Sequence, residues 1–222
     1  PSAGCHWRLA RQCDTRTSVH PALAGEPPVA PIADRFRTID GMASPHRKTV
    51  RHYDLPNHAH ELTFSTYRRL PVMLGPGIPE VVLASIARIR DRGLARILAF
   101  VLMPEHVHVL LVPTVSGGEV IPVASILSGI KRPSSFRIKR LMASSDPDRL
   151  RELTVRERPD KTAFRFWQEG GGYDRNLTSR EAVWASIEYI HENPVRRGLC
   201  KHASDWAWSS WDQWHGETTE VP

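Results

Sequence analysis

The spacing of apolar residues in the middle of the chain predicts a short series of strands and helices. Residues 61–67 (Glu-Leu-Thr-Phe-Ser-Thr-Tyr) have the β-branched and aromatic content of a strand. From Pro79 to Arg92, apolar residues recur at helical spacing with arginines on the other side, which predicts an amphipathic helix. Two apolar runs follow, at 95–103 and 106–112, separated by a short turn. They predict an antiparallel hairpin.

The second half of the chain continues the alternation. A helix is predicted over 121–142, with Pro133 as the position where it would break. The charged segment 144–162 is expected to be a loop, and 164–167 (Phe-Arg-Phe-Trp) a short strand. A last helix should begin at Thr178 or Ser179 and run to about Asn193, where Pro194 would end it.

These elements together predict one α+β domain, in which helices pack on an antiparallel sheet. We place this domain at residues 46–215, followed by a tail of residues 216–222. The tryptophans of the last part of the chain should pack back on the domain. Residues 1–45 differ, because prolines are scattered there among small and polar residues without an apolar period. They are expected to form a disordered or irregular extension.

Composition narrows the class of partner. The formal net charge is +6 and the pI is about 9.6, so an acidic partner is favoured over a neutral one. The longest apolar runs are too short to cross a membrane, and no export signal is visible. The three cysteines are odd in number and lack metal-type spacing. We therefore expect a cytoplasmic, nucleoid-associated protein with free thiols and no membrane partner.

Two pairs of histidines have the spacing of metal ligands on a strand. Residues i and i+2 of a strand face the same way, so His106 and His108 could converge on one divalent cation. Two surface histidines on a strand would give the same pattern. His58 and His60 repeat it at the start of the first predicted strand, without flanking apolar residues, although His60 could approach the same cleft.

Two tyrosines are candidate nucleophiles. Tyr189 and Asn193 are four residues apart on a predicted helix, so a hydroxyl and an amide oxygen would lie on one face. Periodicity alone favours a packing role for both. Tyr173 follows three glycines and could be exposed. A tyrosine that attacks a phosphodiester forms a covalent phosphotyrosine, and a bound metal would offset the developing charge.

Several other enzyme classes lack their motifs in this sequence. No Cys/His zinc spacing is present, and no Gly-x-Ser-x-Gly elbow. The run Gly170-Gly171-Gly172 has no adjoining lysine and serine or threonine, so it is not a phosphate-binding P-loop.

Five stretches in order resemble the REP-associated tyrosine transposases, a group within the HUH single-tyrosine transposases. They are Leu-Met-Pro-Glu-His-Val-His-Val-Leu at 102–110, Phe-Trp-Gln at 166–168, Gly-Tyr-Asp-Arg at 172–175, Tyr-Ile-His-Glu-Asn-Pro-Val-Arg-Arg-Gly-Leu at 189–199 and Asp-Trp-Ala-Trp-Ser-Ser at 205–210. The similarity spans residues 50–212 and leaves out the proline-rich extension.

This resemblance implies a ferredoxin-like HUH palm and assigns roles to the candidate residues. His106, His108 and Asn193 would bind a divalent metal, Mg²⁺ or Mn²⁺, and Tyr189 rather than Tyr173 would be the nucleophile. The implied activity is cleavage and strand transfer of single-stranded, hairpin-containing DNA through a 5′-phosphotyrosine, by a monomer or homodimer.

Contacts to DNA are expected from Lys131, Arg132, Tyr173 and Arg175. Arg196 and Arg197 are expected to be further phosphate contacts. Two alternatives stay open. One is a catalytically silent protein that only binds hairpin DNA, and the other is a metal-dependent RNA-processing enzyme.

Overall fold

A four-stranded antiparallel sheet forms the centre of the computed structural model, which describes residues 54–216. The predicted disordered extension, residues 1–45, lies outside these described residues. In space the strands follow the order β2-β3-β1-β8, with bounds β1 Ala59–Ser65, β2 Ala95–Leu102, β3 His106–Pro113 and β8 Tyr173–Leu177. The predicted hairpin is confirmed, because β2 and β3 pair antiparallel across a turn of three residues.

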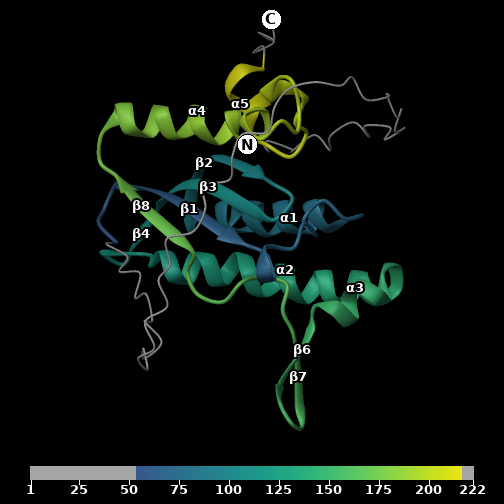
Figure 1. Cartoon of the computed structure of the whole chain (residues 1–222). Coiled ribbons are helices and arrows are strands. Elements are labelled where there is room, and N and C mark those ends of the chain that lie inside the picture. The colour runs from purple at the N-terminus through teal and green to yellow at the C-terminus, as the bar shows by residue number, and fades with distance from the viewer. Residues whose placement is uncertain (1–53, 217–222) are drawn as a thin grey trace, which may run out of the picture. The chain divides into compact units, whose positions relative to one another are not determined.

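Helices cover both faces of this sheet. Figure 1 shows α4, Arg180–Arg196, on one face, while α1, Ile78–Asp91, and α2, Val123–Ser145, lie on the other. The α+β class and the helices packed on an antiparallel sheet are therefore as predicted. The remaining elements are short: η1 Tyr67–Arg69, β4 Val115–Ser116, β5 Glu119–Val120, α3 Pro147–Glu152, β6 Thr154–Arg158, β7 Lys161–Phe164, η2 Ala203–Asp205 and α5 Trp211–His215.

The prediction of a loop at 144–162 was wrong. Asp146 caps a short helix, α3, by accepting a hydrogen bond from the backbone N–H of Arg149, and Pro147 occupies the first turn. β6 and β7 then form a two-stranded hairpin that projects beyond α3 in Figure 1. Charged side chains do not prevent a strand, because both faces of this hairpin are largely exposed.

The fourth strand of the main sheet also differs from the prediction. Of the segment 164–167, Phe164 ends β7 and Trp167 forms an isolated bridge with Thr66, and β8 forms the edge of the main sheet instead. Gly172 makes this possible, since its φ is +79° and a Cβ there would lie 2.2 Å from the carbonyl oxygen of Thr63. A side chain at this position would push β8 away from β1.

Both prolines predicted to interrupt helices lie inside them. α2 continues through Pro133, and α4 continues past Pro194 to Arg196. Pro194 is in the last turn of α4, where its missing N–H removes a single hydrogen bond. The chain leaves the helix at Gly198, with φ +67°, and the N–H of Gly198 donates to Val195 O.

The tryptophan-rich end packs back on the domain, as predicted. Its backbone runs along the outer edge of β2, where Leu102 N donates to Trp208 O and Ser210 N donates to Phe100 O. The indole of Trp206 adds a hydrogen bond to Leu102 O. This segment covers the edge strand, which would otherwise offer unpaired backbone groups. Within residues 54–216 no helix has both the length and the apolar character needed to cross a membrane.

Candidate active site

The histidines of β3 lie on the face of the sheet that α4 covers. Strand pairing places His108 beside Val101 on one neighbour and Thr63 on the other, and His106 beside Ser65. Further along the same face, the strands supply an apolar cluster that packs against α4, including Leu110. All eight residues of β3 are buried, so both imidazoles are largely withdrawn from water.

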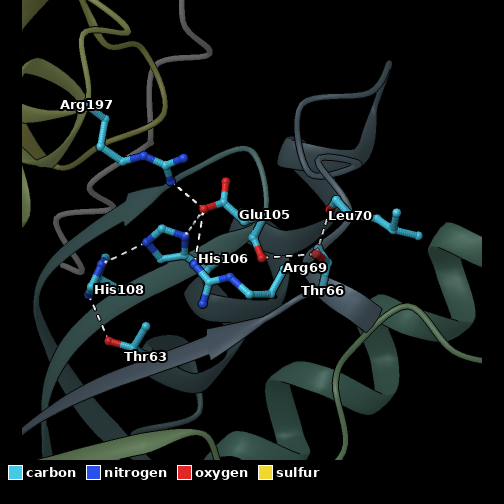
Figure 2. Close-up of polar contacts among 8 residues, drawn as sticks. All are labelled: Thr63, Thr66, Arg69, Leu70, Glu105, His106, His108 and Arg197. Atoms are coloured by element: carbon cyan, nitrogen blue, oxygen red, sulfur yellow. Dashed lines mark hydrogen bonds and ion pairs between the residues drawn. The ribbon is translucent and has the colours of Figure 1, made fainter. Parts of the chain in front are cut away.

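The two imidazoles converge on one point. Their Nε2 atoms are 3.0 Å apart, and the rings meet edge to face. The Nδ1 atom of each ring, on the side away from this point, has its own polar partner. His106 Nδ1 lies 3.0 Å from Glu105 Oε1, and His108 Nδ1 lies 2.9 Å from Thr63 Oγ1 (Figure 2). Protein histidines that bind metals are oriented in this way by a carboxylate or another polar group on the far nitrogen.

These contacts fix a lone pair of His106 toward the point that the two imidazoles share. The Glu105 carboxylate only accepts hydrogen bonds, so His106 Nδ1 carries the proton and Nε2 presents a lone pair. The Thr63 hydroxyl can donate or accept, so it fits either tautomer of His108. At a metal–nitrogen distance of about 2.1 Å, two nitrogens 3.0 Å apart subtend roughly a right angle at the ion. The donor set therefore fits two neighbouring ligands of one divalent cation.

Burial keeps both imidazoles in the form that binds cations. It lowers the pKa of His108 to about 4, with a further contribution from the charge of His106. Burial also lowers the pKa of His106 below its ordinary value, although Glu105 opposes this. Both side chains are thus neutral near pH 7, as metal ligation requires.

Glu105 connects the histidines to two arginines. Its Oε1 accepts hydrogen bonds from Arg197, just past the end of α4, and from Arg69 Nη2 at 3.3 Å, besides contacting His106 (Figure 2). Burial alone would raise the pKa of Glu105, but the hydrogen bond from Arg197 and the charge of His106 outweigh it and the pKa is lowered. Glu105 therefore stays ionised and ties the end of α4 to β3.

Tyr189 lies beside the histidine pair. Its ring centroid is 5.9 Å from that of His108, with the two rings perpendicular, and 41% of the residue is exposed. The guanidinium of Arg196 lies 5.3 Å from the centre of the Tyr189 ring. The structure thus brings together a tyrosine open to solvent and a histidine that sequence reasoning assigned to the same site.

Asn193 lies one turn further along α4 and is buried. Its amide nitrogen donates to Tyr189 O at 2.8 Å, which leaves the amide oxygen as the atom that would bind a cation. Across residues 54–216, no group of three or more His, Cys, Asp or Glu side chains is arranged to hold a metal. A third protein ligand for the histidine pair would therefore have to be of another type, such as this amide.

Tyr173 and Arg175 lie on the same face of the sheet as the histidines, but at its edge. In β8, Tyr173 pairs with Thr63 and Arg175 pairs with Glu61, and both side chains are exposed. Tyr173 is separated from His108 by the strand that carries Thr63. Of the two tyrosines considered, Tyr189 is the one in ring contact with His108.

Lys131 and Arg132 lie on α2, which covers the opposite face of the sheet. The ammonium group of Lys131 donates to Gln168 O and to Gly170 O at 3.2 and 2.8 Å, and burial lowers its pKa to about 8. Lys131 therefore fixes the loop before β8. Arg132 is exposed.

His60 does not approach this site. Strand alternation turns it to the α1 and α2 face, where its Nδ1 lies 3.0 Å from Asp174 Oδ1 and both side chains are buried. The expectation that His60 could approach the cleft is wrong, because His60 is three residues before Thr63 on β1 and Thr63 faces His108.

No protein-family model matches this sequence, and neither does any curated protein. A REP-associated tyrosine transposase bound to a REP hairpin superposes with a TM-score of 0.55 at 18% identity, over 77% of this chain and 93% of that one. This chain has the fold of a REP-associated tyrosine transposase. The resemblance drawn from sequence motifs is confirmed at the level of the fold.

A second similar structure is a putative transposase from Deinococcus radiodurans, which is 20% identical over 64% of this chain and 95% of that one, with a TM-score of 0.36.

Sequence reasoning missed the residues that orient the site. Glu105 directly precedes His106, so an acidic residue next to a candidate ligand was an available signal. Thr63 could not be found without the register between β1 and β3. Arg197, which was expected to contact phosphate, was not expected to form its ion pair with Glu105.

Proposed function

We propose that this protein cleaves and rejoins single-stranded, hairpin-containing DNA in a metal-dependent reaction, with Tyr189 as the nucleophile. The observation that carries the proposal is the convergence of two neutral imidazoles, 3.0 Å apart at Nε2, next to a solvent-accessible tyrosine. The shared fold adds support, since the similar REP-associated tyrosine transposase was solved bound to a REP hairpin.

The covalent step exchanges one phosphate ester for another. The Tyr189 oxygen attacks the phosphorus of the scissile phosphodiester, an O–P bond to the tyrosine forms, and the bond from phosphorus to the 3′-oxygen breaks. The phenol loses a proton and the departing 3′-oxygen gains one. The products are a 5′-phosphotyrosine and a free 3′-hydroxyl. Attack by the 3′-hydroxyl of another strand reverses these steps and transfers the strand.

The cation would be held by His106, His108 and the amide oxygen of Asn193. When bound, Mg²⁺ or Mn²⁺ would offset the negative charge that develops on the non-bridging phosphate oxygens. Glu105 and Thr63 hold the imidazoles in place without touching the ion. Arg196, against the Tyr189 ring, would favour the approach of a phosphate.

DNA would contact residues on both sides of the β8 edge. Tyr173 and Arg175 face the site side and are exposed, so they are suited to a base and a phosphate. Arg132 on α2 is suited to another phosphate. Lys131 would add positive charge near the loop that it holds, more weakly because its ammonium already has two carbonyl partners.

A cleavage assay tests this function. The probe is a pool of end-labelled single strands that carry a palindromic hairpin between randomised flanks, incubated with Mn²⁺ or Mg²⁺ and separated on a denaturing gel. We expect a covalent protein–DNA adduct that chelator abolishes, that Tyr189→Phe loses and that Tyr173→Phe keeps. Loss in Tyr173→Phe with retention in Tyr189→Phe would overturn the assignment of the nucleophile.

The same assay separates the alternatives. If the wild type binds the hairpin in every metal condition but never forms an adduct, the protein is a silent hairpin-binding module. If RNA versions of the pool are cleaved and DNA is not, it is an RNA-processing enzyme.

A further inference from the structure

α2 carries an uncompensated positive charge. Its 23 residues include five basic side chains and no acidic one; the basic residues are Lys131, Arg132, Arg137, Lys139 and Arg140. All but Lys131 are exposed. A helix of this kind attracts polyanions rather than a protein surface of mixed charge.

An aromatic ring lies within this basic surface. Phe136 is 62% exposed, the highest value among the large hydrophobic side chains of residues 54–216. Arg132 precedes it by one helical turn and Arg140 follows it by one, with the Arg140 guanidinium 6.0 Å from the ring centroid. A large apolar side chain between cations gains nothing by facing water, but it offers a flat surface on which a base can stack.

Phe136 forms part of a groove of about 460 Å³ between α2 and the segment 164–167. Its walls include Arg132 and Lys139 on the helix side and Phe164 and Trp167 on the other. Arg165 also lines it but is paired with Glu157 and Glu169. Among residues 54–216, none that lines the groove is acidic, so its walls combine cationic side chains with aromatic rings.

The groove begins at the end of the sheet that carries the histidines. Gln168 N donates to Ser65 O, and Ser65 is the strand partner of His106. The loop that Lys131 holds then leads into β8, whose first residue, Tyr173, is exposed on the site face. A strand leaving the site can therefore pass over the β8 edge, beside Tyr173, and enter the groove.

We propose that this groove binds the single-stranded DNA that flanks the cleavage site, with one base stacked on Phe136 and phosphates on Arg132 and Lys139. The inference rests on the proposed function, because it concerns the same substrate. An unpaired strand is the fitting occupant, since the bases of a duplex stem are stacked on each other and cannot stack on a side chain.

Binding measurements in the Tyr189→Phe background test the groove without cleavage. The probes are a labelled oligothymidylate and a blunt DNA hairpin with no single-stranded flank, followed by fluorescence anisotropy. We expect Phe136→Ala to weaken oligothymidylate binding about 10-fold, as for the loss of one stacked base, and Phe136→Trp to restore it. Binding of the blunt hairpin should be unchanged in both.

Arg132→Ala and Arg137→Ala form a matched pair, because both arginines are exposed on α2 but only Arg132 lines the groove. Arg132→Ala should lower the slope of log affinity against log salt by about 0.7, as for one lost phosphate contact on a single strand. Arg137→Ala should leave it unchanged. If both variants lowered the salt slope equally, the arginines of α2 would attract DNA through their general charge and not through the groove, and the proposal would be overturned.

Three other results would also overturn it: no loss in Phe136→Ala, an equal loss for the blunt hairpin, or a change of oligomeric state in Phe136→Ala by sedimentation. Failure of the proposed function gives a different outcome. In that case the groove variants lose oligothymidylate binding while the wild type forms no adduct in the cleavage assay. Adduct formation with unaffected oligothymidylate binding would instead refute the groove and keep the function.

Discussion

The two faces of the central sheet are both buried, yet they differ in chemistry. On the α1 and α2 face, β3 contributes Val107, Val109 and Leu111, all fully buried, and the buried polar residue there, His60, comes from β1. On the α4 face, the same strand begins with His106 and His108 and only then becomes apolar. Burial alone therefore does not mark the candidate site. The feature that distinguishes the site is a pair of histidines, two residues apart, at one end of a buried strand.

This difference assigns separate tasks to the faces. The apolar face supplies the stability that comes from removing hydrocarbon from water. The polar end of the other face must satisfy each buried nitrogen, which it does through Glu105, Thr63 and the contact between the imidazoles. Substitutions on the two faces should accordingly change different measured quantities.

The largest effect is expected on the site face. Replacing His108 with leucine removes a proposed metal ligand while keeping an apolar side chain of similar size in a buried position. Metal-dependent adduct formation should fall on the order of 1000-fold, as when one group that stabilises transition-state charge is lost. The free energy of unfolding of the metal-free protein should fall little or rise, because a buried polar ring is replaced. A loss of several kcal/mol without loss of activity would contradict the division of tasks.

On the supporting face, Leu111→Ala should do the reverse. The substitution leaves a cavity at a fully buried position and should cost about 3 kcal/mol of unfolding free energy. Urea unfolding monitored by tryptophan fluorescence measures this cost. Adduct formation per folded molecule, assayed well below the melting temperature, should stay within about 2-fold of wild type. A far greater drop in activity would show that the faces are coupled.

Glu105→Gln tests the orientation of His106 directly. The amide keeps the size of the side chain but removes the charge that fixes the proton on His106 Nδ1. Mn²⁺ affinity, measured by titration calorimetry without DNA, should fall about 10- to 100-fold. Glu61→Gln is the matched control, because Glu61 is a buried carboxylate on the same face that bonds to Ser186 instead. Equal losses in both variants would argue against a positioning role.

The effect of pH is small for each pH unit and accumulates gradually. The pKa of His108 is lowered to about 4 from an ordinary 6.5, so between these values the unfolded chain takes up a proton that the folded protein does not. The metal-free protein should therefore be fully stable above pH 6.5 and lose about 1.4 kcal/mol per pH unit for this group as the pH falls toward 4. His108→Leu should show a shallower decline in chemical denaturation over the same range.

Much of the fold followed from the sequence because its elements have strong local signals. The amphipathic repeat of α1 and the apolar runs of β2 and β3 were sufficient to predict a helix and a hairpin. The prediction failed at β8, whose residues Tyr-Asp-Arg-Asn-Leu have no strand-like composition. This strand forms because Gly172 lets the chain come close to β1, which is a tertiary effect.

The candidate site also has a part that local sequence signals predict and a part that depends on tertiary contacts. Strand alternation made His106 and His108 candidates and helical spacing made Tyr189 and Asn193 candidates, but the choice of Tyr189 over Tyr173 came from the family resemblance. The proximity of Tyr189 to His108 depends on how α4 crosses the sheet, and the sequence alone did not contain it. The roles of Thr63 and Arg197 also depend on contacts between residues far apart in the chain.

The segment around Trp206 to Ser210, whose backbone pairs with the outer edge of β2, has a consequence for how the protein folds during synthesis. A nascent chain that has emerged only as far as Arg197 holds every candidate site residue, but the edge of β2 is still open and His191 lacks its 2.9 Å contact with Ser210 Oγ. The ribosome adds the following segment within seconds. Until it docks, α4 is seated on the sheet without its neighbour and the bare edge is exposed to other nascent chains. The segment after α4 therefore completes the edge of the sheet only once it has been synthesised and has docked on β2.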